Sequence, residues 1–395
     1  MNDSDLQIPQ AIPFGDITEE ELYELSQLTG ESEEALQSAD DIMPAPNDVL
    51  LPGVMSDFFT PMGRFIVDGK AFGEVTEEAA TANNIAKIIA KLNELEGAVR
   101  AAAVGKTTKK GGTPGTNYYS AINKMRKWLA NPIREEIPFP IFVKGNKKLP
   151  FWQFSAPPGI TCPGAGTCLK KPDGTQGYCY SFSGWAKVFP FMRQLQNLLL
   201  LRINKGQLIR DAWNKLPKGQ VVRLYVDGDI DSSTTLDFWM DLCHERPDLR
   251  VYGYSKSWHF FTKRHAERPN DWPSNYLVNI SDASKFWNVP KIRDAMIKVP
   301  VVRGLFASVT VTKSHMPKLS TAQAKQGMSN KKLPGWSEHM QDVRDAAAER
   351  GITNWAPRGG APFSCPGLCA DCLPKGRHAC GEPSMKNITI VIGIH

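Results

Sequence analysis

The chain has 395 residues, of which 42% are hydrophobic and 22% are charged, so it holds enough apolar material for two or three domains with their own cores. No apolar run is long enough to span a bilayer, and the first ten residues, MNDSDLQIPQ, lack the charged-then-apolar pattern of a secretory leader. The sequence therefore argues against a membrane or secreted protein and predicts a cytoplasmic one, in a reducing compartment.

The net charge of +6 hides an uneven division along the chain. The first 60 residues hold fourteen of the 41 acidic residues and none of the 47 basic ones, which leaves the remainder with 27 acidic residues and a surplus of 20 positive charges. A basic body with an acidic tail indicates a polyanionic partner such as DNA or a nucleotide, with the tail as a shield, although ordinary solvated charge would look the same.

The N-terminal half is expected to be mostly helical. Residues 1–70 form an acidic tail, partly helical or disordered, with short helices at 18–28 and 32–41. Residues 71–147 form a helical segment with a long helix at 76–104 and a basic, Gly-containing linker at 106–117. Basic and aromatic residues alternate at 119–129 and 254–265, which suits phosphate contact with base stacking and equally suits an amphipathic helix.

Strands and helices alternate within residues 148–345. A strand at 149–160 leads into a cysteine loop, and a helix covers 188–213. Near-continuous apolar strands then alternate with helices, which predicts an α/β fold: a partial (β/α) barrel or an open parallel sheet with helical crossovers. The expected strands are 221–230, 249–257, 274–281 and 302–311, and the expected helices are 233–246, 259–268 and 291–299.

Seven of the eight cysteines fall into two clusters rich in Gly and Pro. Cys162, Cys168 and Cys179 form the first, and Cys365, Cys369, Cys372 and Cys380 form the second, within residues 346–395 that end in a final strand at 387–395. In a reducing compartment such clusters predict metal ligation rather than disulfides. The second cluster is a closed four-ligand site for an iron–sulfur cluster or zinc, with His378 as an alternative to Cys380. Cys243, mid-helix, is expected to be a small buried hydrophobe.

Polar residues follow the predicted strands at the edge where parallel α/β proteins bind ligands. They are Asp227, Gly228 and Asp229 after the first strand, Ser255 and Lys256 after the second, and Asn279, Ser281 and Asp282 after the third. Asp227, Asp229 and Asp231 could hold Mg²⁺ for a nuclease, but the same triplet also suits a turn in which Asp231 or Ser232 caps the next helix.

The order of these features resembles the radical S-adenosylmethionine superfamily. That resemblance implies a [4Fe–4S] cluster on Cys162, Cys168 and Cys179, preceded by the aromatic Tyr178, and a cofactor-binding strand end at Gly228 and Asp229. Ser255 and Asn279 on neighbouring strand ends would contact S-adenosylmethionine, and Asp229 with Lys256 would serve catalysis. The spacing of the first cluster departs from the family's Cys-x3-Cys-x2-Cys, which occurs here at Cys365, Cys369 and Cys372, where no barrel can follow it.

A nearer resemblance covers residues 151–380. The motifs TCPGAGTC, CYSF, RLYVDGDIDS and VYGYSKS are similar to those of the gene product 88 family of tailed-phage proteins. The matching positions are Cys162, Cys168, Cys179, Tyr180, Gly228, Asp229 and Lys256.

Two hypotheses follow. In the first, a phage or prophage iron–sulfur enzyme takes an electron from a reductant, cleaves S-adenosylmethionine and acts on a nucleotide or DNA base in the host cytoplasm. In the second, both clusters hold zinc, and the protein is a nucleic-acid-binding or host-interaction module without turnover. The sequence carries no signal of an oligomeric state.

Overall fold

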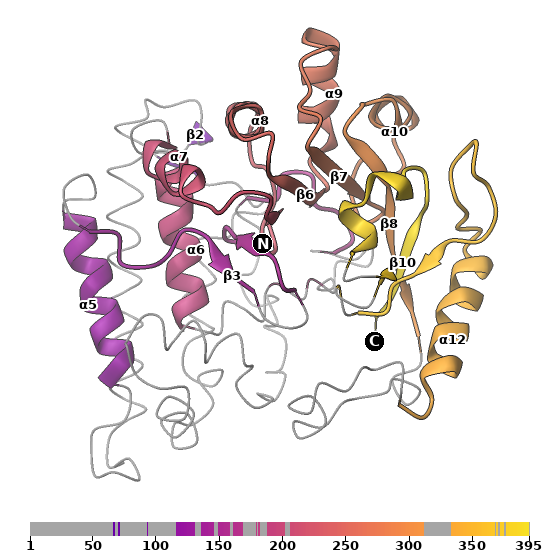
Figure 1. The fold of residues 1–395 in the computed structure, drawn as a ribbon, viewed down its shortest axis with the longest axis horizontal. Coiled ribbons are helices and arrows are strands. Elements are labelled where there is room, and N and C mark those ends of the chain that lie inside the picture. Colours follow the sequence, from indigo (N-terminus) through magenta and orange to yellow (C-terminus); the bar gives the residue numbers. More distant parts are fainter. Residues whose placement is uncertain are drawn as a thin grey trace, which may run out of the picture. The chain divides into compact units, whose positions relative to one another are not determined.

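A computed structural model describes somewhat more than half of the chain (Figure 1). The longer described stretches are 116–130, 136–145, 149–158, 161–168, 188–201, 206–311, 333–367 and 377–394. Shorter pieces are residues 66–67, 70–71, 93, 179, 181, 369 and 372–374. The described chain divides into two compact units. The first comprises residues 1–143, 154–163 and 169–215, and the second comprises 144–153, 164–168 and 216–395.

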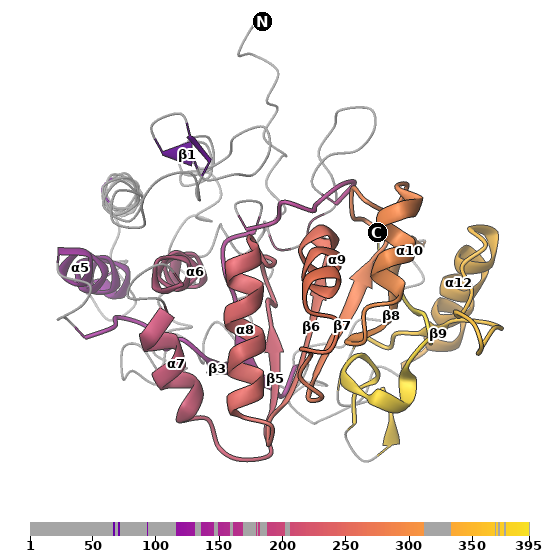
Figure 2. The ribbon, with the colours of Figure 1, turned by 90° about the horizontal axis from the view of Figure 1, so that it is seen from above.

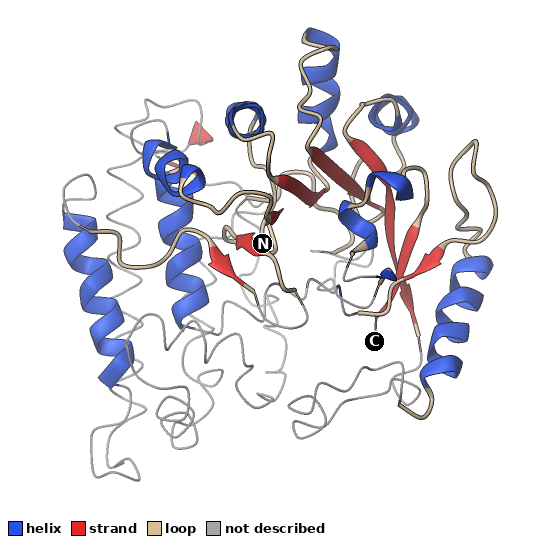
Figure 3. Cartoon of the chain, in the orientation of Figure 1, coloured by secondary structure: helices blue, strands red, loops and turns tan. Residues whose placement is uncertain are grey.

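The fold is built around an open eight-stranded sheet with the order β3-β4-β5-β6-β7-β8-β10-β9 (Figure 3). The ladders from β5 through β8 to β10 and β9 are all parallel. The bounds are β3 Val143–Lys144, β4 Trp152–Phe154, β5 Val221–Leu224, β6 Arg250–Ser255, β7 Tyr276–Ser281, β8 Val302–Thr310, β9 Phe363–Ser364 and β10 Ile390–Ile394. The expected parallel α/β sheet is confirmed, as an open sheet and not a closed barrel.

Three crossover helices cover one face of this sheet (Figures 1 and 2). They are α8 Ser233–Glu245, α9 Trp258–Glu267 and α10 Pro290–Ile297. Because β5, β6, β7 and β8 are neighbours in sequence order, right-handed crossovers place all three helices on the same side. Leu236, Trp239 and Phe261 are fully buried there, opposite strand residues such as Val222 and Val278.

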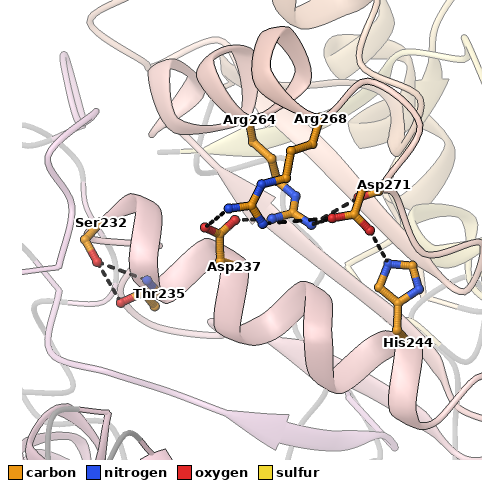
Figure 4. A network of polar contacts seen from close by, with 7 residues as sticks. All are labelled: Ser232, Thr235, Asp237, His244, Arg264, Arg268 and Asp271. Carbon is orange, nitrogen blue, oxygen red and sulfur yellow. Dashed lines mark hydrogen bonds and ion pairs between the residues drawn. The ribbon is translucent and has the colours of Figure 1, made fainter.

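Charged residues also link α8 to α9 (Figure 4). The Arg264 side chain is 3% exposed; its Nη1 pairs with Asp237, and its Nη2 lies 2.8 Å from Asp271 Oδ2. His244 Nε2 lies 3.2 Å from Asp271 Oδ1, and Arg268 approaches Asp237 at 3.5 Å. A buried guanidinium is thus neutralised by two carboxylates.

The opposite face of the sheet carries the C-terminal segment. Short 3₁₀ helices η7 (Ala379–Gly381) and η8 (Pro383–Met385) pack against β6, β7 and β8. Tyr252, Tyr254 and Phe306 point to this face and form an aromatic cluster with Phe151. Helix α12 (Trp336–Glu349) packs beside β8 and β10.

In the first unit, α5 (Thr116–Ala130) packs beside α6 (Val188–Leu200), and α7 (Gln207–Asn214) follows. Buried amides on α6 bind extended backbone: Gln196 exchanges hydrogen bonds with Phe139 N and O at 3.0 and 2.9 Å, and Asn197 Nδ2 donates to Ser155 O at 2.9 Å. A minimal hairpin joins β1 (Ile66–Val67) to β2 (Lys70–Ala71).

Several expectations differ from the structure or lie outside it. The helix expected at 188–213 is two helices, because Gly206 adopts a left-handed conformation (φ 72°) before α7. Helix α12 and strand β9 were not expected. The helices expected at 18–28 and 32–41 lie outside the described residues, as does nearly all of 76–104 and of the linker at 106–117.

Candidate metal centre and strand-end loop

The four C-terminal cysteines gather over one face of the sheet. Cys365 directly follows β9, and Cys380 lies in η7, which packs on β6 and β7. All four contact a single apolar cluster that includes Tyr252 and Ile390. Cysteines separated by fifteen residues therefore meet at one place, as the Cys-x3-Cys-x2-Cys-x7-Cys spacing predicts for a chelating loop.

The local backbone suits thiolate ligands. Gly367 adopts a left-handed conformation (φ 75°), which turns its N–H back onto Cys365 Sγ at 3.4 Å. Side-chain hydrogen bonds that the Cys372 thiol donates to Cys365 and Cys369, together with burial, raise the pKa of Cys372 well above its usual range. Cys372 is therefore within hydrogen-bonding reach of both Cys365 and Cys369.

This closeness bears on what the site could hold. Four sulfurs around a single tetrahedral ion lie about 3.8 Å apart when metal–sulfur bonds are about 2.3 Å long. In a [4Fe–4S] cluster each thiolate binds a different iron, so the sulfurs stand at the outer corners, farther apart. Within the described residues, no three His, Cys, Asp or Glu side chains stand in a ready-made metal-holding arrangement.

The fourth cysteine, Cys380, is buried and lies in one cluster with Tyr252 and Tyr254. Burial raises the pKa of Cys380 to about 12, while a side-chain hydrogen bond from Tyr254 lowers it. The Tyr252 hydroxyl is buried and has no hydrogen-bond partner among the described residues. Burial raises the pKa of Tyr252, and the neighbouring Cys369, Cys380 and Cys372 raise it as well. An unpaired buried hydroxyl facing thiols is a donor for a metal-bound thiolate, so the residues present fit a metal–thiolate centre.

A buried cation lies on the same face. Arg303 is fully buried on β8 and donates to Asn279 Oδ1, Met385 O, Ile388 O and Leu305 O. Asn279 donates to Gly253 O at 3.0 Å and to Cys380 O at 2.9 Å, and its expected role in cofactor binding stays a prediction. Its side chain therefore ties η7 to the sheet. Burial lowers the pKa of Arg303, and the neighbouring Cys380 and Tyr254 raise it.

His378, the predicted alternative ligand, is packed between rings. Its centroid lies 4.3 Å from that of Phe151 and 4.5 Å from that of Tyr252. Its buried Nε2 has no hydrogen-bond partner among the described residues and faces Gly381, where a Cβ would stand 2.2 Å away. Burial, with Arg250 and Arg223 nearby, lowers the pKa of His378 to about 4, so the imidazole is neutral at pH 7.

Part of the first cysteine loop crosses the carboxyl edge of the sheet. Gly166 N donates to Ala283 O and Lys285 N donates to Gly164 O, both at 3.0 Å, as a short antiparallel bridge. Ser284 Oγ donates to Gly164 O at 3.2 Å and to Lys256 O at 2.7 Å. A Cβ on Gly164 would stand 1.9 Å from Lys256 O, so only glycine allows this approach. The segment 164–168 thus shares the strand-end edge with the predicted polar residues.

Asp229 is the polar centre of that edge. It is 4% exposed; its Oδ1 accepts from Ile230 N and its Oδ2 accepts from Lys256 N, both at 2.7 Å. Ser255, also buried, donates to the same carboxylate. Burial raises the pKa of Asp229, whereas these hydrogen bonds and Lys256 lower it. The carboxylate therefore joins the ends of β5 and β6.

The other residues singled out in the sequence each have a local structural role. Gly228 makes a left-handed turn (φ 79°) before Asp229. Ser232 caps α8 by accepting from Thr235 N at 3.1 Å, and Asp231 accepts from Thr235 Oγ1, as the helix-cap interpretation predicts. Cys243 is fully buried, as expected.

Not all of the first cysteine cluster is described in one unit. Cys168 belongs to the second unit and Cys162 and Cys179 to the first, so their joint binding of one cluster stays a prediction. Tyr178 and Tyr180 lie outside the described residues.

Of the two stretches that mix basic and aromatic residues, 119–129 lies in α5, whereas 254–265 begins in β6 and continues into α9. Trp128 in α5 and Trp258 and Phe261 in α9 are buried. Arg264 forms ion pairs with Asp237 and Asp271. These side chains belong to cores, which leaves them unable to stack on bases. No described helix combines the length and apolarity needed to cross a bilayer.

The fold and sites define an open parallel α/β protein that carries a cysteine-rich segment against one sheet face. The family model of gene product 88 matches residues 123–372, well over half of the sequence, so the chain belongs to the gene product 88 family of phage proteins. The match includes both cysteine clusters apart from Cys380. No curated protein and no solved structure matches the chain.

Sequence reasoning missed the residues that surround the four cysteines. Tyr252, Tyr254 and Arg303 lie inside strands whose alternation signalled only a buried sheet. The one available signal was chemical: an arginine and two tyrosines in strands that otherwise read as apolar.

Proposed function

We propose that this phage protein binds one divalent metal ion, zinc in the first place, through Cys365, Cys369, Cys372 and Cys380, and acts as a binding module without turnover at that site. The observation that carries the proposal is the gathering of all four cysteines on one apolar cluster above the sheet, with Cys372 within hydrogen-bonding reach of Cys365 and Cys369. Sulfurs within such reach suit a single tetrahedral ion better than a four-iron cluster.

The bound ion would supply folding free energy rather than reactivity. Structural tetrathiolate sites are closed, with no position left for substrate. The raised pKa values of Cys372 and Cys380 keep these thiols protonated in the metal-free protein, and a cation reverses that preference and releases protons. Metal affinity should accordingly rise with pH, and the metal should fasten residues 365–380 to β6 and β7.

Metal content and a pair of buried cysteines test the proposal. The full chain, purified without oxygen, should contain one zinc per chain at this site. Cys380→Ala should lose it, whereas Cys243→Ala, at an equally buried cysteine on the helix-covered side, should keep it. Iron with equimolar sulfide that disappears in Cys380→Ala would show a cluster there instead and refute the zinc assignment.

The surplus of 20 positive charges outside residues 1–60 favours a polyanionic partner for this module. Because Trp128 in α5 and Trp258 and Phe261 in α9 are buried, binding should run mainly through phosphate contacts, with little base preference and strong salt dependence. Deleting residues 1–60 should tighten DNA binding at low salt. Unchanged affinity would remove the idea that this segment is a shield.

A second candidate function rests on the strand-end loop. Residues 164–168 lie at the carboxyl edge of the sheet beside Asp229 and Lys256, where parallel α/β proteins bind ligands. We propose as the alternative that Cys168, which lies in this segment, holds an iron–sulfur cluster together with Cys162 and Cys179 and that the cluster serves radical cleavage of S-adenosylmethionine. Protein reconstituted with iron and sulfide and reduced with dithionite should then cleave that cofactor, and Cys168→Ala should abolish cleavage. No cleavage by the wild-type protein, or equal cleavage by Cys168→Ala, would refute this candidate.

A further inference from the structure

We propose that Arg303 is the buried counter-charge of the metal–thiolate centre, so that metal binding and the attachment of β10 strengthen each other. The inference rests on the four-cysteine metal site proposed above and adds a residue that no motif contains.

Two buried arginines of the described chain differ in the charge of their hydrogen-bond partners. Arg264 is neutralised by Asp237 and Asp271 (Figure 4). Arg303 is more deeply buried, yet all of its hydrogen-bond partners are uncharged oxygens, and no carboxylate in the described part of the chain pairs with it. A buried guanidinium without a counter-charge is costly. Its neighbours that can become anionic are Cys380 and Tyr254.

The charges balance when metal is bound. Four thiolates and one divalent ion carry a net charge of −2. Arg303 supplies one positive charge on this face, and Arg223 supplies a second, with its guanidinium 4.8 Å from the centroid of Tyr254, which in turn donates to Cys380. Protonated thiols without metal would leave the Arg303 guanidinium beside a neutral Cys380.

A β-bulge in β8 sets the direction of the Arg303 side chain. The β7–β8 register runs from Val278 opposite Val302 to Asn279 opposite Gly304, which leaves Arg303 as the extra residue of a bulge. Bulges re-aim side chains, and here the side chain reaches Asn279 and the segment before β10.

One arginine therefore links the metal segment to the last strand. Asn279 accepts from Arg303 and donates to Cys380 O, on the metal side. On the other side, Arg303 Nη1 donates to Met385 O at 3.0 Å and Ile388 O at 2.6 Å, immediately before β10. A negative charge gained at the cysteines would therefore stabilise Arg303, the residue that holds the segment before β10.

The test uses the full chain and zinc. Zinc affinity is measured by competition with a chromogenic chelator, and urea unfolding is followed with and without zinc. Arg303→Met should lower zinc affinity by roughly 10- to 100-fold and shrink the stabilisation by zinc. Arg303→Lys, which loses the same fork geometry but keeps the charge, should recover most of the affinity. Arg264→Met should destabilise the protein and leave zinc affinity unchanged.

Different results would refute the metal site and the counter-charge role of Arg303. Wild-type protein that binds no metal at these cysteines refutes the metal site itself. Normal wild-type binding with unaltered affinity in Arg303→Met, or with equal losses in the Met and Lys variants, refutes only the counter-charge. If Arg303→Met does not fold, Arg223→Met on the same face should still weaken zinc binding several-fold, and unchanged affinity there overturns the inference.

Discussion

His378 should make the stability of the protein depend on pH below neutrality. The ring is packed between Phe151 and Tyr252, its Nε2 is buried without a partner among the described residues, and Arg223 and Arg250 oppose a further positive charge. Its pKa is therefore lowered to about 4 in the folded protein. Replacing it by leucine, in His378→Leu, removes the titration and keeps an apolar side chain of similar size.

The sign and size follow from proton linkage. Between pH 6.5 and pH 4 the unfolded chain binds a proton at His378 that the folded chain does not, so the free energy of unfolding falls as pH falls. With an unfolded pKa of about 6.5, the loss reaches about 2 kcal/mol at pH 5 and about 3 kcal/mol once pH is below 4.

Urea unfolding of metal-free protein, from pH 7.5 to pH 5, measures this. Wild type should lose about 2 kcal/mol more than His378→Leu over that interval, because every other titrating group is common to both proteins and cancels. Parallel pH profiles for the two proteins would show that His378 keeps an ordinary pKa, and the account of its environment would be wrong.

Three further substitutions probe the strand-end edge and the helix layer. Gly164→Ala would force a Cβ to within 1.9 Å of Lys256 O and should cost up to about 3 kcal/mol, the worth of the three hydrogen bonds that hold the loop; unchanged thermal stability would contradict the loop's placement. Asp229→Asn should cost about 2 kcal/mol at pH 7, since an amide cannot accept on both sides, and a loss near zero in urea unfolding would argue against the two 2.7 Å bonds. Asp237→Asn should cost only about 1 kcal/mol, because a third of that side chain is exposed and Asp271 still pairs with Arg264; a loss above about 3 kcal/mol would show that Asp271 does not compensate.

The central sheet could be predicted because its signals are local. Strands β5 to β8 are continuous apolar runs, and each is followed by a helix whose start is marked in sequence, as by Ser232 at α8. Local pattern also located the buried Cys243 and the strand-end edge that Asp229 occupies. These features depend on neighbours within about thirty residues.

The rest depends on pairing between distant residues. Strand β9 has only two residues, too few for any periodicity, and nothing in β10 states that it enters between β8 and β9. The bulge at Arg303 is a register shift, which leaves no mark on composition. Spacing predicted that the four C-terminal cysteines act together, which stays a prediction, but that they lie over Tyr252 and Tyr254 follows from packing across more than one hundred residues.

The place of β10 constrains how the protein can be made. It is synthesised after β9, yet it supplies the ladders that join β9 to β8 on either side of it. Strand β9 therefore has no partner in the sheet until β10 has paired with β8. The two C-terminal strands, and the cysteine segment between them, must join the sheet together and after β8.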